Sequence, residues 1–135
     1  MGVTSTLIDK IALIETKDRS ILSTRSKGKE KYYIPGGKRE GQETDTETLI
    51  REIKEELSVT IHPSSINYLG TFTAPSDGAP EGVQVQMTCY TATYSGTLAA
   101  NSEIEEVVWL TYQDIEKVSA VDKIIFNFLK DRGEL

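Results

Sequence analysis

One run of glycine, charged and aliphatic residues, from Gly36 to Val59, constrains the fold more than any other part of the chain. It reads GGKREGQETDTETLIREIKEELSV, and its second half has the spacing of an amphipathic helix. At 3.6 residues per turn, its aliphatic residues fall on one side: Leu49, Ile50, Ile53 and Leu57. Its last glutamates share an arc of about 100° on another side: Glu52, Glu55 and Glu56. We therefore expect a helix that packs its aliphatic side on the core and whose acidic side has a role other than packing.

The acidic side of this helix is costly unless something neutralises it. Carboxylates that close repel one another, raise one another's pKa and weaken the helix. A cation held between them removes the penalty, and hard divalent ions such as Mg²⁺ or Mn²⁺ prefer oxygen ligands. Glu52, Glu55 and Glu56 are thus predicted metal ligands.

The same run resembles the signature of the Nudix hydrolases, GX5EX7REUXEEXGU, in which U is aliphatic. Gly37 is followed after five residues by Glu43, and seven more lead to the segment from Arg51 to Val59. Every specified position matches except the late glycine, where this chain has Ser58. Glycine would adopt a left-handed backbone at low cost there; serine either bears a cost of about 1 kcal/mol or ends the helix differently.

The resemblance implies a fold and an activity. The expected fold is α/β, a Nudix-type α/β/α sandwich with a mixed sheet, a loop-helix-loop formed by the signature, and a C-terminal helix. The expected activity is metal-dependent hydrolysis of a nucleoside diphosphate linked to another moiety, as in the MutT-like pyrophosphohydrolases. A Nudix-fold sensor that binds nucleotide without hydrolysing it is the alternative from another functional class.

The resemblance also assigns expected roles within the signature. The metal ligands would be Glu52, Glu55, Glu56 and the backbone carbonyl of Gly36. Glu52 is in addition a candidate for orienting or deprotonating the attacking water. Arg51 and Glu43 would hold the helix and its preceding loop in register, and Arg51 would orient Glu52.

Several residues outside the acidic helix complete the expected site. Family members often add an acidic residue from a later loop, and the candidates are Glu103, Glu105 and Glu106, of which Glu103 is favoured by its spacing ahead of Trp109. Substrate contacts are expected from Gly37, Lys38 and Arg39. Glycine allows a close approach of backbone to ligand, and the two cations can meet phosphates.

Substrate choice is open at this stage. The short chain is more similar to MutT-like enzymes, which implies a nucleoside triphosphate cleaved to a monophosphate and pyrophosphate. A proline some fifteen residues beyond the signature is associated with ADP-ribose hydrolysis in the family, and Pro75 lies sixteen residues past Val59. ADP-ribose or another sugar nucleotide is therefore the alternative substrate.

Length and charge bound the remaining possibilities. With 135 residues, positions 1–135 are expected to form one domain. A net charge of −6 disfavours a nucleic-acid polymer as partner, because such binding usually needs a basic face. A single cysteine and the lack of a long apolar run favour a cytoplasmic protein with no membrane span. The expected assembly is a monomer or homodimer, between which the sequence does not decide.

Local patterns predict the other elements. A hairpin is expected from strands at 7–16 and 20–24, with a brief strand at 32–34 that ends at Pro35. Thr44 and Glu47 have the spacing of a capping box at the start of the acidic helix. The remaining predictions are short strands at 59–61, 66–73, 83–94 and 107–110, a long loop at 74–82, a short helix start or turn after Thr111, and a terminal helix at 121–132.

Overall fold

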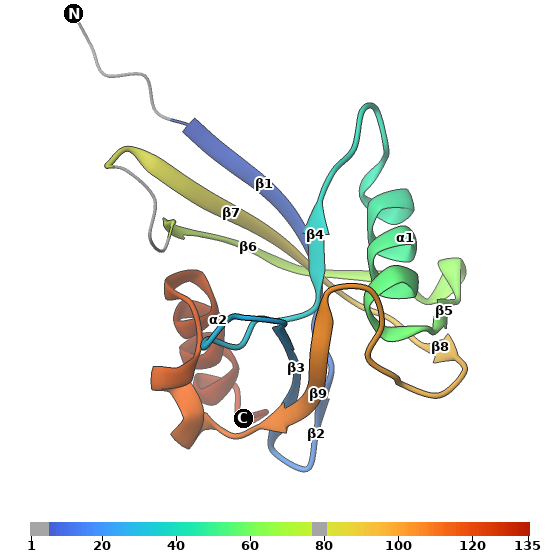
Figure 1. Cartoon of the computed structure of the whole chain (residues 1–135). Helices are drawn as coiled ribbons and strands as arrows, with labels where there is room; N and C mark the ends of the chain where they lie inside the picture. Colours follow the sequence, from blue (N-terminus) through green and yellow to red (C-terminus); the bar gives the residue numbers. More distant parts are fainter. Residues whose placement is uncertain (1–5, 77–80) are drawn as a thin grey trace, which may run out of the picture.

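The central feature of the structure is a mixed sheet with one helix on each side (Figure 1). The computed structural model describes residues 6–76 and 81–135. Its strands are β1 (Thr6–Leu13), β2 (Thr16–Lys17), β3 (Ser20–Ser26), β4 (Gly36–Lys38), β5 (Thr60–Ile61), β6 (Asn67–Pro75), β7 (Val83–Thr91), β8 (Tyr94–Ser95) and β9 (Ile104–Leu110). Its helices are α1 (Asp45–Leu57) and α2 (Ala120–Asp131), and the 3₁₀ turns are η1 (Pro63–Ser65) and η2 (Tyr112–Lys117).

The strands form one main sheet and two smaller ones. The main sheet has the order β4-β1-β7-β6, in which β1 and β7 run parallel and the other neighbours are antiparallel. A second, antiparallel sheet has the order β2-β3-β9, and β5 pairs with β8. The predicted α/β sandwich with a mixed sheet is confirmed.

Two apolar cores, one on each face of the main sheet, explain why this sandwich is stable. On one face, α1 buries Leu49, Ile53 and Leu57 against Ile11 and Leu13 of β1. On the other face, α2 packs on the sheet through a second set: Val121, Ile125, Phe126 and Leu129 against Ala12, Met87 and Cys89. Alternate residues of β1 thus serve opposite cores, as the two-residue period of a strand requires.

The predicted hairpin between positions 7–16 and 20–24 is wrong for most of its length. Only Thr16 and Lys17 pair with β3, through a tight turn in which Asp18 and Arg19 have φ of 51° and 61°. β1 instead pairs with β4 and β7. The reason is burial: Ile11 to Ile14 form an unbroken buried run, which suits a central strand covered on both faces.

Other local predictions need smaller corrections. Residues 32–34 form only isolated bridges, and the strand begins at Gly36 instead. The segment Ala74–Gly82 is not all loop, since β6 continues to Pro75; positions 77–80 lie outside the described residues. The strand predicted at 107–110 carries Trp109, which is 37% exposed, and in α2 Ile124 is 42% exposed while Phe126 is buried.

Within residues 6–76 and 81–135, neither helix combines the length and apolar composition required to cross a membrane.

Candidate active site

Both ends of α1 are fixed by local hydrogen bonds, and this fixes the direction of its acidic side. The Thr44 hydroxyl accepts a bond from the Glu47 N–H at 3.1 Å, and Glu47 Oε1 accepts one from the Thr44 N–H at 2.9 Å. The predicted capping box is therefore confirmed. At the other end, Ser58 adopts a left-handed conformation with φ of 64°, and its N–H donates to the Lys54 carbonyl. The serine keeps the backbone geometry that the family's glycine would give.

The glycine pair of β4 allows two close approaches. At Gly36, φ is 146°, and a side-chain Cβ would lie 2.7 Å from the Ala12 Cα. At Gly37, a Cβ would lie 2.6 Å from Glu52 Oε1. Gly36 thus lets β4 pair tightly with β1, whereas Gly37 leaves room for the Glu52 carboxylate. The predicted contact of Gly37 with substrate is a separate matter and stays a prediction.

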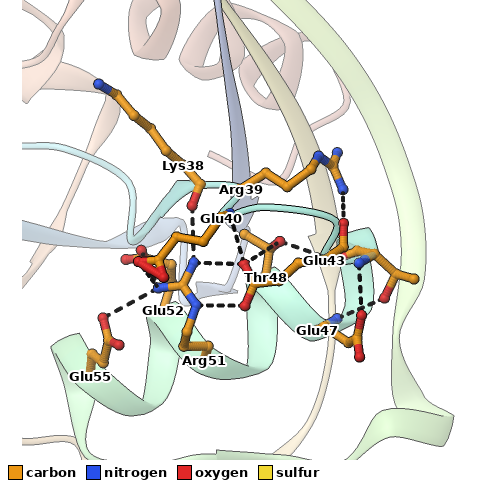
Figure 2. Close-up of polar contacts among 10 residues, drawn as sticks. Lys38, Arg39, Glu40, Glu43, Glu47, Thr48, Arg51, Glu52 and Glu55 are labelled. Atoms are coloured by element: carbon orange, nitrogen blue, oxygen red, sulfur yellow. Dashed lines mark hydrogen bonds and ion pairs between the residues drawn. The ribbon is translucent and has the colours of Figure 1, made fainter.

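Arg51 joins the loop before α1 to the helix itself (Figure 2). Its Nε and Nη2 donate to both oxygens of Glu43, at 2.7 and 2.9 Å, and its Nη1 donates to Glu52 Oε1 at 2.8 Å. Nη2 also donates to the Lys38 carbonyl at 3.0 Å. The Arg51 guanidinium, with the Glu40 N–H, lowers the pKa of Glu43 to about 2. The expected contacts between Arg51, Glu43 and Glu52 are all present.

Glu56 is the most deeply placed carboxylate of the signature. Its side chain is 8% exposed, and its Oε1 accepts a hydrogen bond from the Gly36 N–H at 3.0 Å. Burial raises its pKa to about 8; the Gly36 N–H opposes this shift, and the charges of Glu52 and Glu103 add to it. Burial also raises the pKa of Glu52, against the effect of Arg51. A buried carboxylate with acidic neighbours is stabilised by a cation.

Glu103 lies with these two carboxylates, and the other acidic candidates do not. Glu52, Glu56 and Glu103 line the same pocket. Glu105 and Glu106 instead face Arg25, at 3.8 and 2.7 Å, and Glu106 also accepts a bond from the Tyr32 hydroxyl. The Ser102 hydroxyl donates to Glu103 at 2.6 Å and lowers the pKa of this carboxyl.

The pocket has a volume of about 480 Å³ and lies where β4, β1 and β7 meet the loops around them. Its charged lining consists of three carboxylates and three lysines: Glu52, Glu56, Glu103, Lys10, Lys29 and Lys38. Tyr33, Val85, Met87 and Val121 add apolar surface, and Thr24, Ser76 and Ser119 add hydroxyls. This size and mixture suit a nucleotide-sized ligand.

The donor chemistry fits a hard divalent cation, although the side chains do not converge on one point. Among the described residues, no three His, Cys, Asp or Glu side chains are grouped closely enough to hold a metal ion. Glu52 is turned toward Arg51 and Glu56 toward the Gly36 N–H, while Glu55 is 52% exposed and 3.5 Å from Arg51. Glu52 and Glu56 are the predicted ligands that line the pocket; Glu55 does not line it. The predicted role of the Gly36 carbonyl stays a prediction.

Lys38 and Arg39 are both predicted to contact substrate phosphates, but only Lys38 lines the pocket. Lys38 lines the pocket, and Figure 2 shows its side chain leading away from Arg51. Arg39 does not line it: its guanidinium donates to Asp9 at 3.1 Å, to Asp45 at 2.6 Å and to the Glu43 carbonyl at 2.8 Å. The structure thus uses Arg39 to tie the loop to β1 and to the first turn of α1.

Sequence reasoning missed several polar residues of the pocket, and Lys10 and Ser119 illustrate why. Lys10 lies in β1, and Ser119 is the residue before α2. Lys10 could have been noticed, since it interrupts the apolar series formed by every second residue, Ile8, Lys10 and Ala12. Ser119 carries no comparable local signal, because only the packing of α2 on the sheet brings it to the pocket.

Comparison with known proteins gives a consistent result. The family model for the NUDIX domain matches residues 9–131. The chain is 29% identical over 118 residues to an ADP-ribose pyrophosphatase of Methanocaldococcus jannaschii, covering 84% of this chain and 68% of that protein. The structure is similar to the solution structure of the E. coli ORF135 protein, with 22% identity, a TM-score of 0.72, and coverage of 95% and 92% of the two chains. It is also similar to the crystal structure of the MutT protein from Methanosarcina mazei Go1, with 16% identity, a TM-score of 0.73, and coverage of 99% and 100%.

Proposed function

Because the chain belongs to the NUDIX domain family, in the class of the Nudix pyrophosphohydrolases, we propose that it hydrolyses a nucleoside triphosphate to a monophosphate and pyrophosphate with the help of Mg²⁺ or Mn²⁺. The observation that carries the proposal is the pocket itself. One part is lined by Glu52, Glu56 and Glu103, which suit a divalent cation, and the same pocket holds three lysines that suit phosphate oxygens. A small nucleotide, rather than a nucleic-acid polymer, fits its volume of about 480 Å³.

The acidic residues of the pocket have different roles in the proposed reaction. A cation held by Glu52 and Glu56 would neutralise charge on the diphosphate oxygens. Arg51 fixes the orientation of Glu52 through the bond at 2.8 Å, and the Gly36 N–H fixes that of Glu56. Glu103 would accept the proton of the attacking water, because a carboxylate that binds a metal is a poor base. The Ser102 hydroxyl donates to Glu103 and lowers the pKa of this carboxyl, which favours the ionised form that can accept a proton.

Two predicted ligands have weaker support. Glu55 lies outside the pocket, and the resemblance alone assigns it to the metal. The Gly36 carbonyl is assigned in the same way. We propose Glu52 and Glu56 as the ligands that this chain's own geometry favours, with Glu55 as an additional ligand that would have to leave Arg51.

ADP-ribose is the second candidate substrate. The relative from Methanocaldococcus jannaschii is an ADP-ribose pyrophosphatase, and Pro75 has the spacing associated with that activity. Pro75 is the last residue of β6, next to Ser76 of the pocket. The product pair separates the candidates, since a triphosphate gives pyrophosphate whereas ADP-ribose gives AMP and ribose phosphate.

The test is a panel of nucleoside triphosphates and sugar nucleotides assayed with Mg²⁺ and with Mn²⁺, with products resolved by mass. Replacing Glu56 with Gln should abolish turnover while keeping an acceptor for the Gly36 N–H. Glu116→Gln is the matched control, because this side chain is 83% exposed and pairs only with Lys123 among the described residues. Undiminished turnover in Glu56→Gln would overturn the proposed site. Tight nucleotide binding without product release would favour a nucleotide sensor.

A further inference from the structure

One face of β1 lines the pocket and carries the positive charge of Lys10, which core packing does not explain. Ile11 packs in the core under α1, whereas Ala12 packs in the core under α2. Because side chains alternate along a strand, Lys10 faces the same side as Ala12. This side is otherwise the apolar floor of the pocket, formed in part by Val85 and Met87.

Lys10 is also directly opposite another lysine. In the antiparallel pairing of β1 with β4, the Cα partner of Lys10 is Lys38. Directly opposite residues point to the same face with their Cβ atoms about 5 Å apart, and like charges in this arrangement destabilise a sheet. Both side chains line the pocket, and Lys29 lines it from the loop after β3.

No carboxylate of the described residues pairs directly with these lysines, although the charge of Lys10 lowers the pKa of Glu56, a carboxylate that the proposed function assigns to the cation. Over the described ranges, none of these three lysines forms an ion pair, and the Nζ of Lys10 lies 5.8 Å from the centre of the Tyr33 ring. The carboxylates of the pocket are otherwise engaged, Glu52 by Arg51, Glu56 by the Gly36 N–H and Glu103 by the Ser102 hydroxyl. An anionic ligand is thus the natural partner of the lysine pair.

The position of the pair relative to the carboxylates defines which anion fits. Lys38 follows Gly37, the residue over which the Glu52 carboxylate lies. The lysine side chains leave the sheet on the face opposite to that of Gly37, yet they line the same pocket as Glu52 and Glu56, the proposed ligands of the cation. We propose that Lys10 and Lys38 form a subsite for the terminal phosphate of a nucleoside triphosphate, in the pocket that Lys29 also lines.

This subsite rests on the proposed function and narrows it. ADP-ribose has only two phosphates, and a neutral ribose occupies the position that the terminal phosphate takes in a triphosphate. The lysine pair therefore selects triphosphates over ADP-ribose, and the selectivity resides in residues outside the acidic helix.

The test compares Lys10→Gln and Lys38→Gln with wild type, using the four common nucleoside triphosphates and ADP-ribose. Each variant should lower kcat/KM for the best triphosphate, relative to that for ADP-ribose, by about tenfold, the scale of one charge-assisted hydrogen bond. Lys17→Gln is the matched control: it changes another strand lysine, which is exposed and does not line the pocket. Equal losses on both substrates would overturn the subsite.

A metal-free titration separates this inference from the proposed function. Calorimetric titration with inorganic tripolyphosphate should give a dissociation constant about tenfold weaker in Lys10→Gln than in wild type and in Lys17→Gln. Melting temperatures should not fall in Lys10→Gln, since the change relieves repulsion. Unchanged tripolyphosphate affinity overturns the lysine subsite. Failure of wild type to hydrolyse any nucleotide overturns the proposed function alone.

Discussion

The buried carboxylate of Glu56 makes the stability of the metal-free protein depend on pH. Its pKa of about 8 in the folded chain exceeds the ordinary value of 4.5, so the folded state binds the proton more tightly than the unfolded state. The resulting stability is fully present below pH 4.5 and is lost as the pH rises through 8. One pKa unit corresponds to about 1.4 kcal/mol, so the shift as a whole corresponds to roughly 5 kcal/mol.

The assay is urea denaturation in EDTA at pH 5, 6, 7 and 8 for wild type and Glu56→Gln. Glutamine keeps an acceptor for the Gly36 N–H but does not ionise. Because the folded-state group is still half protonated at pH 8, the free energy of unfolding of wild type should fall by roughly 3.5 kcal/mol relative to that of the variant over this range. Glu55→Gln, a change at a side chain that is 52% exposed, should parallel wild type and serves as the control.

Two results would refute this reasoning. The first is a constant difference in unfolding free energy between wild type and Glu56→Gln from pH 5 to pH 8, which would mean that Glu56 ionises freely. The second is a difference that grows in the opposite direction. Saturating Mg²⁺ at pH 8 should restore part of the lost stability in wild type and less of it in the variant, because a cation that binds only the folded state stabilises it.

Three further changes test the framework of the site. Arg51→Met should lower the melting temperature by about 5 °C and reduce kcat, because it leaves the carboxylate of Glu52 without its guanidinium partner. A thermal melt and a turnover assay measure the two effects, and an unchanged kcat would contradict the positioning role. Gly37→Ala should reduce turnover strongly, because a Cβ would lie 2.6 Å from Glu52 Oε1. Gly41→Ala is the control: its Cβ would have nothing within 4 Å, and at a φ of 54° it should cost only about 1 kcal/mol of unfolding free energy and keep activity. Similar turnover in both variants would refute the steric argument. Ser58→Gly should raise the unfolding free energy by about 0.5–1 kcal/mol, because glycine adopts a φ of 64° without the steric cost. Urea denaturation measures the change, and a decrease would show that the serine side chain stabilises the helix end.

The acidic helix could be predicted from sequence because its determinants are local. The aliphatic spacing, the capping box of Thr44 and Glu47, and the left-handed end at Ser58 all act within a few residues of one another. The contacts of Arg51 with Glu43 and Glu52 are similarly short in sequence, spanning eight residues and one residue. Helix geometry alone therefore brings most of the signature residues to one place.

The strand pairing could not be predicted in the same way. Residues 7–16 and 20–24 have the local appearance of a hairpin, yet β1 pairs in parallel with β7, from Thr6 with Val83 to Leu13 with Tyr90. Such a pairing depends on which apolar faces are covered by helices, and no turn residue signals it. The exposure of Trp109 has the same origin, since a strand's composition does not tell which face is covered.

Sequence by itself thus determined the family, the helix and the set of carboxylates on its acidic side. Only the tertiary structure decided which charges share the pocket. It selects Glu103 over Glu105 and Glu106, turns Arg39 toward Asp9 and Asp45, and places Lys10 opposite Lys38. The physical reason is range: a helix sets side-chain directions from neighbours a few residues away, whereas a pocket between strands is set by partners that are distant in the chain.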